Sequence, residues 1–303
     1  MKTGYSENDI IDIIKRIYPQ ATNIQKMNEG LVSQTYYFKN LGISFVFQIS
    51  TDKLGYEKEN YVFKTFSKDI SVKNILKIEN YQDDIYYCIS EYIDAKRLHD
   101  LTTYEIKEKI FDIMDILETM KNINIDYNKG YGYFDSKGDA PYGSWKGFIQ
   151  AVINDKEYKF YNIDMKKNNV IEKSLNEIEK YYNILDERKC LIHGDFGSYN
   201  VLSNDKTIFL IDWSLGLYGD PLYEIANVLF WNEKCLNPLI KEINKKIITD
   251  DNIRLKIYIY MLRTGLEEIN MNLKNNNAKN NEWLNNRIED IIKNYWKKST
   301  NFV

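Results

Sequence analysis

The stretch "LIHGDFGSYNVL", residues 191–202, contains two overlapping patterns that share one residue. In the first pattern, Asp195 is followed five residues later by Asn200. In the second, Asp195 opens an Asp-Phe-Gly triplet. The two patterns assign Asp195 different roles, a proton acceptor in the first and a metal ligand in the second. One carboxylate cannot easily perform both, so the neighbouring sequence has to decide.

The residues on either side favour the first role. Upstream, "SLNEIEKYYNILDERKC" reads as a helix and a turn, with no His and no Asp-to-Asn spacing of the required length. Downstream, the strand-like run "TIFLI" is followed directly by Asp212. In phosphoryl transfer, one carboxylate takes the proton of the acceptor hydroxyl, while an Asn and a second Asp hold magnesium. The sequence therefore predicts Asp195 as the base and Asn200 and Asp212 as magnesium ligands.

The chemistry of these side chains supports that interpretation. Hard oxygen ligands suit magnesium rather than zinc. A single Asp at a strand end is usually a turn or cap residue, but three oxygen-bearing side chains at this spacing favour catalysis. We expect His193 to brace the loop by structural hydrogen bonds rather than to carry a proton. His99, the other histidine, is expected at the surface.

Composition limits the class of protein. The 303 residues are 44% hydrophobic, enough for one large domain or two lobes with cores of their own. A net charge of −3 argues against a general nucleic-acid binder. No apolar run approaches ~18 residues, so no membrane span is expected. Three scattered cysteines, without a CxxC motif, indicate reduced thiols and a cytoplasmic protein. We expect a monomer.

The pattern along the chain predicts an α+β protein. Residues 7–17 form an amphipathic helix after the cap Ser6, without the order of a signal peptide. Strand-like runs and one helix fill the rest of the first hundred residues. Apolar residues at helical spacing then predict long helices over residues 102–123, 170–187 and 252–273, interrupted by a short β island around Asp195.

The sequence around Asp195 and Asp212 resembles a known family. The run "LIHGDFGSYNVL…FLIDWSLGLYGDPLYEIANVLFW" is similar to the aminoglycoside phosphotransferases, and the Asp-Phe-Gly-Ser-x-Asn loop to the hygromycin B phosphotransferases among them. "KMNEGLVSQTYYF", "YVFKTF", "GYGYFDSKG…SWKGFI" and "YMLRTGLEEI" extend the likeness over roughly residues 23–283. The resemblance implies a two-lobed protein-kinase-like fold, with a β-rich nucleotide-binding lobe (residues 1–93) and a mainly helical catalytic and acceptor-binding lobe (residues 94–303).

The resemblance also assigns roles to individual residues. It implies that Asp195 is the catalytic base and that Asn200 and Asp212 bind Mg²⁺. Asp220 would brace the loops behind the site. The nucleotide, ATP or GTP, would be held by a phosphate loop, a strand residue, a helix acid and a hinge: Gly30, Ser33, Gln48, Glu59, Ser90, Glu91, Tyr92 and Ile93.

Gln48 departs from the family pattern. Family members usually carry Lys or Arg at this strand position, paired with the acid that Glu59 matches, and "SFVFQIS" contains no basic residue. Losing a charge-assisted contact costs about 1.5–3 kcal/mol. Lys53 or Lys58 could compensate, nucleotide binding could be weak, or the donor could differ. Our hypothesis is that the protein is active despite Gln48, with a comparison against Gln48→Lys as its test.

The acceptor implied by the resemblance is a cationic aminoglycoside. Carboxylates and aromatic faces should line its site. Opposite charges in contact near a protein surface attract each other by roughly a few kcal/mol. The candidates lie in the helical lobe: Trp145, Trp231, Glu233, Glu267 and Glu268. Each could equally be an ordinary helix acid or core aromatic.

Two alternatives stay open at this stage. One is a kinase of the same fold for another small hydroxyl acceptor, such as a choline-like compound, a sugar or a macrolide. The other is a nucleotide-binding pseudokinase, which Gln48 favours and the triad of Asp195, Asn200 and Asp212 opposes.

Overall fold

The computed structural model describes residues 2–27, 30, 32–154, 158–162, 169–275, 277 and 281–298. The chain divides into two compact units. The first comprises Met1–Arg97, Asp135–Gly138 and Asn200–Leu215; the second comprises Leu98–Phe134, Asp139–Tyr199 and Gly216–Val303. The first unit thus runs past residue 93 and takes in two later segments, the second of which carries Asn200 and Asp212.

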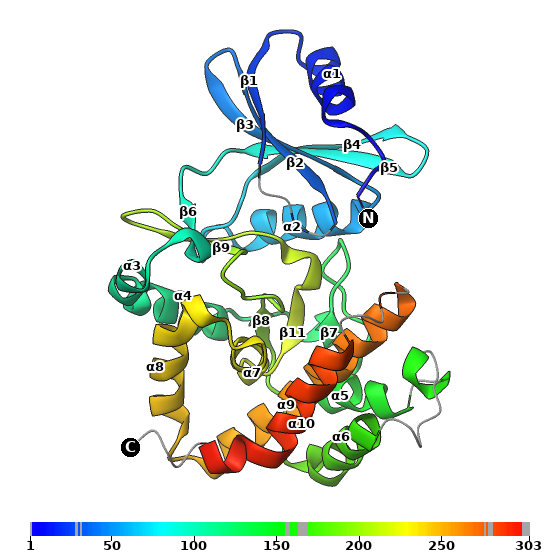
Figure 1. Ribbon diagram of the computed structural model, residues 1–303, viewed down its shortest axis with the longest axis vertical. Helices are drawn as coiled ribbons and strands as arrows, with labels where there is room; N and C mark the ends of the chain where they lie inside the picture. Colours follow the sequence, from blue (N-terminus) through cyan, green and yellow to red (C-terminus); the bar gives the residue numbers. More distant parts are fainter. Residues whose placement is uncertain are drawn as a thin grey trace. The chain divides into compact units, whose positions relative to one another are not determined.

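The first unit is built on an antiparallel sheet of five strands in the order β1-β2-β3-β5-β4 (Figure 1). The strands are β1 (Ala21–Lys26), β2 (Gln34–Asn40), β3 (Ile43–Ser50), β4 (Ile75–Gln82) and β5 (Ile85–Glu91). Two further short strands, β9 (Val201–Ser203) and β10 (Ile208–Leu210), form a hairpin that pairs with β6 (Lys96–Arg97) in a second sheet. The β-rich character expected for the N-terminal part is confirmed.

Two helices cover opposite faces of the five-stranded sheet. Helix α1 (Glu7–Ile17) begins with the predicted Ser6 cap in a full capping box and packs Ile10 and Ile14 against Phe47 of β3. Helix α2 (Lys53–Phe66) lies on the other face, where its Tyr56 packs with Cys88 of β5.

Residue alternation decides which side chains of β3 and β5 face α2. Successive side chains of a strand point to opposite faces. Phe47 and Ile89 face α1, so Gln48 and its cross-strand partner Cys88 face α2. The position that departs from the family pattern therefore lies on the same face of the sheet as Glu59.

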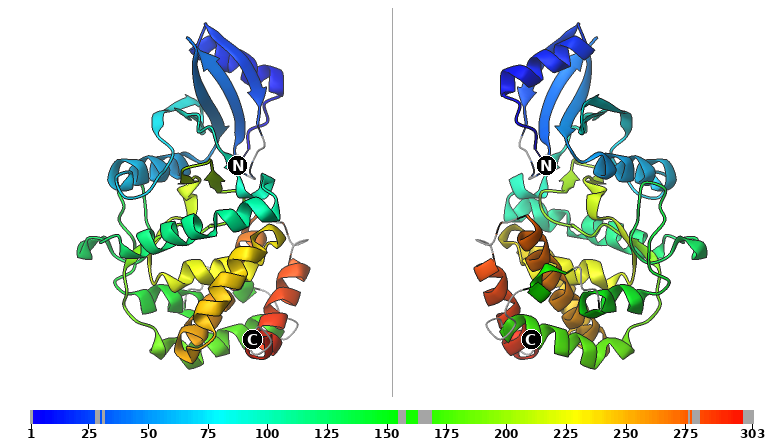
Figure 2. Two further views of the ribbon diagram at one scale, coloured as in Figure 1. Left: turned by 90° about the vertical axis from the view of Figure 1, so that its left-hand side faces the viewer. Right: turned by 90° about the vertical axis from the view of Figure 1, so that its right-hand side faces the viewer.

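The second unit is mainly helical, as expected, so the α+β class is confirmed. Its helices are α3 (Thr103–Glu108), α4 (Ile110–Asn122), α5 (Trp145–Asn154), α6 (Asn169–Tyr181), α7 (Leu222–Trp231), α8 (Asn237–Ile247), α9 (Asp251–Lys274) and α10 (Asn281–Lys298). Helix α9 is buried along most of its length, and α7 and α10 pack along it (Figures 1 and 2). A small sheet in the order β7-β11-β8 completes the unit, with β7 (Gly132–Tyr133), β8 (Cys190–Ile192) and β11 (Leu217–Gly219).

Two predicted helices are shorter than their patterns indicated. The segment 102–123 breaks at Lys109, where α3 ends and α4 begins. The segment 170–187 leaves the α-helical conformation after Tyr181 and continues as a turn of 3₁₀ helix. Apolar periodicity continued through both points, but it reports which face is buried and not where the backbone hydrogen bonds stop.

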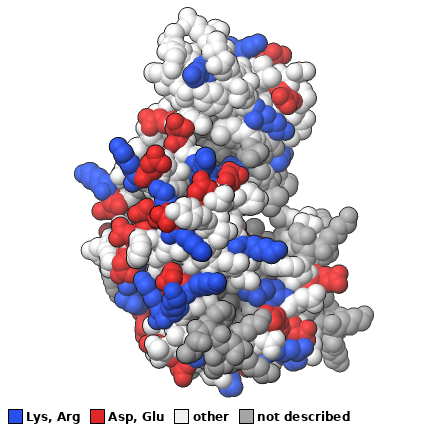
Figure 3. Space-filling view, turned by 60° about the vertical axis from the view of Figure 1, so that its left-hand side comes forward, with Lys and Arg blue, Asp and Glu red and all other residues white. Residues whose placement is uncertain are grey.

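Among the described residues, no helix is long and apolar enough to cross a bilayer. On the face of the molecule in Figure 3, acidic and basic side chains are interspersed rather than gathered into a patch of one sign.

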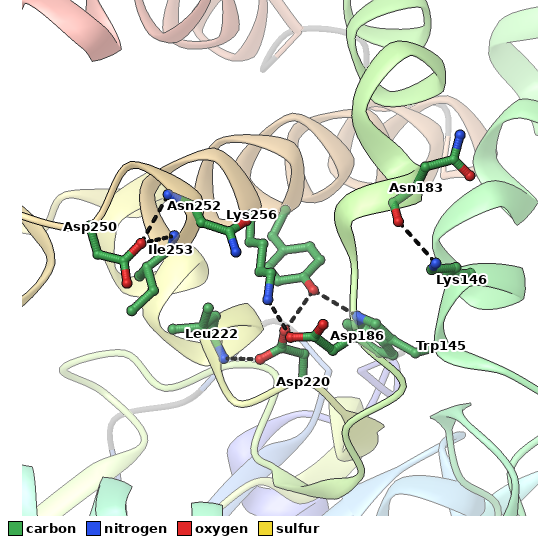
Figure 4. Close-up of polar contacts among 11 residues, drawn as sticks. Trp145, Lys146, Asn183, Asp186, Asp220, Leu222, Asp250, Asn252, Ile253 and Lys256 are labelled. Atoms are coloured by element: carbon green, nitrogen blue, oxygen red, sulfur yellow. Dashed lines mark hydrogen bonds and ion pairs between the residues drawn. The ribbon is translucent and has the colours of Figure 1, made fainter.

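A buried polar chain ties β11 to α7, α9 and α5 (Figure 4). Asp220, fully buried, accepts hydrogen bonds from the backbone N–H of Leu222 (3.0 Å) and the hydroxyl of Tyr260 (2.9 Å). The indole N–H of Trp145 donates to the same hydroxyl at 2.8 Å. Burial raises the pKa of Asp220, and these donors oppose that rise. Asp220 thus braces the end of β11 and the start of α7.

The Tyr260 hydroxyl should be a large single contribution to stability. In Tyr260→Phe, the Asp220 carboxylate loses a donor and the indole N–H of Trp145 loses its acceptor in a buried site. We expect a loss of about 2–3 kcal/mol in the free energy of unfolding, since unsatisfied buried polar groups cost ~1–3 kcal/mol each. Urea unfolding measures it. The exposed Tyr104→Phe is the matched control, and an equal effect in both variants would contradict the assignment.

Candidate active site

The predicted magnesium ligands flank the β9–β10 hairpin of the first unit. Asn200 directly precedes β9, and Asp212 lies two residues beyond β10. The backbone N–H of Ile211 donates to the carbonyl of Asn200 at 3.0 Å, which extends the strand pairing to the residue next to Asp212. Strand pairing therefore brings together two residues that are twelve positions apart in the sequence.

The backbone at Asp212 is held in an uncommon conformation. Its φ is 62°, in the left-handed region that disfavours residues with a side chain. Its N–H donates to Oε1 of Glu59 on α2 at 2.9 Å, and its carboxylate accepts from the hydroxyl of Ser214 at 2.7 Å. These bonds hold the carboxylate of Asp212 in one place at the end of the hairpin.

The donor set suits magnesium. Among the described residues, no group of three or more His, Cys, Asp or Glu side chains could hold a metal ion by itself. Magnesium is usually held by one or two protein oxygens together with phosphates and water rather than by an all-protein cage. Asn200 and Asp212 match that requirement.

The candidate nucleotide residues of the first unit form a connected set. The side-chain amide of Gln48 lies 3.4 Å from the hydroxyl of Ser33, its acceptor. The carbonyl oxygen of the same amide accepts a hydrogen bond from Nζ of Lys73 at 2.8 Å. Lys73 also forms an ion pair with Oε2 of Glu59 at 2.8 Å. Sequence reasoning missed Lys73, since it lies outside every motif. Gly30, the other candidate of the phosphate loop, has open space beside its backbone, since an added Cβ atom would meet no atom within 4 Å.

The hinge candidates lie at the end of β5. Ser90 is fully buried, and Glu91 is the last residue of the strand. The backbone N–H of Glu91 donates to the carbonyl of Asn74 (3.1 Å), and that of Tyr92 to the carbonyl of Ser44 (3.3 Å). Ile93 follows with its carbonyl accepting from the N–H of Ala95 at 3.0 Å.

Asp195 lies in the second unit, on the loop that follows β8. His193 is fully buried, and its Nδ1 accepts the backbone N–H of Asp195 at 3.3 Å. The predicted bracing role of His193 is therefore confirmed. Gly194 adopts a φ of 80°, which a residue with a Cβ rarely does, and this turns the chain sharply before Asp195.

A buried carboxylate from α7 holds this loop. Oε2 of Glu224 accepts the backbone N–H groups of His193 and Gly194. Burial raises the pKa of Glu224 to about 7, and these N–H groups oppose that rise. The amide of Asn227, one turn along α7, donates to the carbonyl of Gly194 at 3.1 Å. Sequence reasoning missed both residues, since their partners in the loop lie 31 and 33 residues away in the chain.

The acceptor candidates differ in how they are engaged within the second unit. Glu233 accepts the backbone N–H of Ser198 at 3.1 Å as well as its hydroxyl. Glu267 forms an ion pair with buried Arg263 at 2.9 Å and accepts the hydroxyl of Tyr158 at 2.8 Å. Both carboxylates are thus partly satisfied by the protein.

The other two acceptor candidates are Trp231 and Glu268. Trp231 is 38% exposed and stacks on Trp283, with ring centroids 5.7 Å apart and an interplanar angle of 8°. Burial, followed by the negative charges of Asp195 and Glu267, raises the pKa of Glu268 to about 7. Glu268 is therefore the candidate whose charge is coupled to Asp195.

Trp145 is wrongly placed among the acceptor candidates. Its side chain is fully buried, stacks on Phe148 and contacts Gly219 so closely that a Cβ there would meet the ring at 2.0 Å. An indole in such a position is core, because no ligand can reach it.

Comparisons with known proteins agree with this geometry. A profile described as the Phosphotransferase enzyme family matches residues 23–243. The match spans more than half of the sequence, and the chain belongs to this family. The hygromycin-B 4-O-kinase of Escherichia coli is 25% identical over 284 residues, 91% of this chain and 82% of that protein.

Solved structures of similar proteins share the fold. A thermostable mutant of the aminoglycoside phosphotransferase APH(4)-Ia, in a ternary complex with AMP-PNP and hygromycin B, is 25% identical with a TM-score of 0.86. The alignment covers 93% of this chain and 97% of that chain. APH(2")-IIia, in a complex with GDP and kanamycin, is 13% identical with a TM-score of 0.66, over 95% of this chain and 98% of that one, and shares the fold.

The raised pKa of Glu268 predicts a pH-dependent stability. Because this pKa rises from its usual 4.5 to about 7 in the folded chain, the carboxyl stabilises the fold fully at acidic pH. That contribution is lost as the pH rises through about 7. From about pH 5 to about pH 8, the free energy of unfolding should fall by about 1–3 kcal/mol less in Glu268→Gln than in the wild type.

Urea unfolding over this pH range measures the difference. Glu108→Gln, which removes an exposed acid of α3, is the matched control and should follow the wild type. Parallel curves for wild type and Glu268→Gln would contradict the raised pKa of Glu268.

Proposed function

We propose that this protein transfers the γ-phosphoryl group of ATP or GTP to a hydroxyl of an aminoglycoside of the hygromycin B type. The observation that carries the proposal is the retention of Asp195, Asn200 and Asp212, each on a braced backbone. The chain is similar to a hygromycin-B 4-O-kinase over 91% of its length, and this similarity supports the substrate class. The 25% identity to APH(4)-Ia, whose structure holds AMP-PNP and hygromycin B, supports it as well.

Asp195 acts on the acceptor. Its carboxylate orients the reacting hydroxyl and accepts its proton, a contribution of about 10²–10⁴ in rate. The buried contacts of His193 and Glu224 hold the loop still, so that little order has to be gained on binding. A negative charge on the neighbouring Glu268 would favour a cationic ligand.

The residues that we propose to bind the nucleotide belong to the first unit. Asn200 and Asp212 would hold Mg²⁺, which neutralises charge on the phosphate oxygens when bound. Gly30 and Ser33 belong to the loop over the phosphates, with Gln48 and Glu59 behind it. Backbone groups of residues 90–93 would receive the base.

The acceptor is held mainly by charge and aromatic surface. Glu267 and Glu268 on α9 and Glu233 after α7 supply carboxylates for the amino groups of the drug. Trp231 offers an exposed ring for a sugar face. We propose that the enzyme is cytoplasmic, because its nucleotide is a cytoplasmic metabolite and its three cysteines are free thiols. We also propose that it is a monomer.

Drug resistance is the first test. Expression of the chain in a sensitive host should raise the minimal inhibitory concentration of hygromycin B, and Asp195→Asn should abolish the gain. Asp205→Asn, an exposed acid between β9 and β10, is the matched control and should keep it. Resistance to a macrolide instead, or none to any aminoglycoside, would overturn the acceptor class.

Purified protein separates catalysis from binding. Asp195→Asn should lower kcat by about 10²–10⁴ because the general base is lost. Its nucleotide affinity should stay close to that of the wild type, since Asp195 acts on the acceptor. Coupled ADP release and nucleotide titration measure the two quantities. An unchanged kcat in Asp195→Asn would sink the assignment of the base.

A further inference from the structure

Strand β3 carries no cation, but one reaches its side chain from another part of the sheet. Lys73 lies on the extended segment between α2 and β4, two residues before β4. Its ammonium is 2.8 Å from Oε2 of Glu59 and 2.8 Å from the side-chain oxygen of Gln48. The acid of α2 therefore has its cationic partner, and that partner comes from a different segment than the family pattern indicated.

The charge of Lys73 is kept although the side chain is buried. Its side chain is 9% exposed and that of Glu59 is 5% exposed. Burial lowers the pKa of Lys73, but attraction to Glu59, Cys88 and Asp212 outweighs it, so the pKa is raised overall. The ammonium is therefore positive at neutral pH and desolvated, the condition under which a cation attracts phosphate most strongly.

The two lysines considered as substitutes are engaged elsewhere. Lys58 donates to the backbone carbonyl of Ser214, and burial lowers its pKa to about 8. Lys53 is half exposed and pairs with Glu57 at 2.9 Å. Lys73 is the lysine that contacts both Gln48 and Glu59.

The neighbours of Lys73 are the residues that the proposed function assigns to the nucleotide. Through Gln48 it connects to Ser33 of the phosphate loop. Through Glu59 it connects to the backbone of Asp212. An ammonium has three N–H donors, and among the described residues Glu59 and Gln48 account for two of them. The third is left for a ligand oxygen.

We propose that Lys73 is the phosphate-binding cation of this protein and that Gln48 and Glu59 orient it. The cation has moved from β3 to the segment before β4, and Gln48 has become its hydrogen-bond acceptor. This inference rests on the proposed use of a nucleoside triphosphate. It assigns to Lys73 a direct contact with the phosphates of the bound nucleotide.

The test compares ligands with and without phosphates. Lys73→Met should weaken the binding of MgATP or MgGTP by roughly ten- to hundredfold, the size of a lost charge-assisted contact. Its affinity for adenosine or guanosine should not change. Lys53→Met, which removes an exposed lysine of the same unit, is the matched control and should bind all four ligands as the wild type does.

Two further variants keep the test sound if Lys73→Met folds poorly. Glu59→Gln/Lys73→Met removes both charges, so no unpaired charge stays buried, and it should still lose affinity for the triphosphate but not for the nucleoside. The exchange Gln48→Lys/Lys73→Gln returns a cation to β3, at the residue whose side-chain oxygen contacts the ammonium of Lys73 in the wild type, and should recover most of the triphosphate affinity.

The possible outcomes distinguish a failure of this inference from a failure of the proposed function. If the wild type binds MgATP or MgGTP and both Lys73→Met and the double neutral variant bind it equally well, the inference is overturned and the proposed function stands. Equal losses for nucleoside and triphosphate would assign Lys73 a structural role and overturn it too. A wild type without affinity for either triphosphate would overturn both.

Discussion

The carboxylate of Glu59 joins three segments of the first unit that are far apart in the sequence. One oxygen accepts the backbone N–H of Asp212, and the other pairs with Lys73. Burying an ion pair costs free energy, which is recovered only if the remaining polar groups are also satisfied. Here Gln48 and the N–H of Asp212 supply those contacts. The position of the β9–β10 hairpin against α2 therefore depends on a carboxylate that has no freedom to move.

The second unit uses the same physical device at its own loop. Glu224, buried in α7, accepts backbone N–H groups on the amino-terminal side of Asp195, and Asn227 bonds the carbonyl of Gly194. The hydroxyl of Thr264 on α9 in turn donates to Asn227 at 2.6 Å. In both units, a polar side chain from a packed helix holds the backbone of a functional loop, so its precision comes from the helical core.

The sequence predicted what is local and missed what is not. The cap at Ser6, the strand runs and the spacing of Asp195, Asn200 and Asp212 are short-range patterns, and the fold class followed from them. Lys73 lies fourteen residues from Glu59 and twenty-five from Gln48. Their meeting depends on strand order and on which residues of β3 face α2, which no motif records. The prediction for Trp145 was wrong for the opposite reason. The sequence next to a family motif does not show whether an aromatic side chain is buried or exposed.

The left-handed backbone of Asp212 places folding and chemistry in opposition at one residue. A residue with a Cβ pays about 1 kcal/mol or more there, whereas Gly would not. Replacing Asp212 by Gly would thus relax the chain while removing the carboxylate, and could raise the melting temperature of an inert protein. Asp at this position therefore lowers the stability of the fold relative to Gly while it supplies the carboxylate that the chemistry needs.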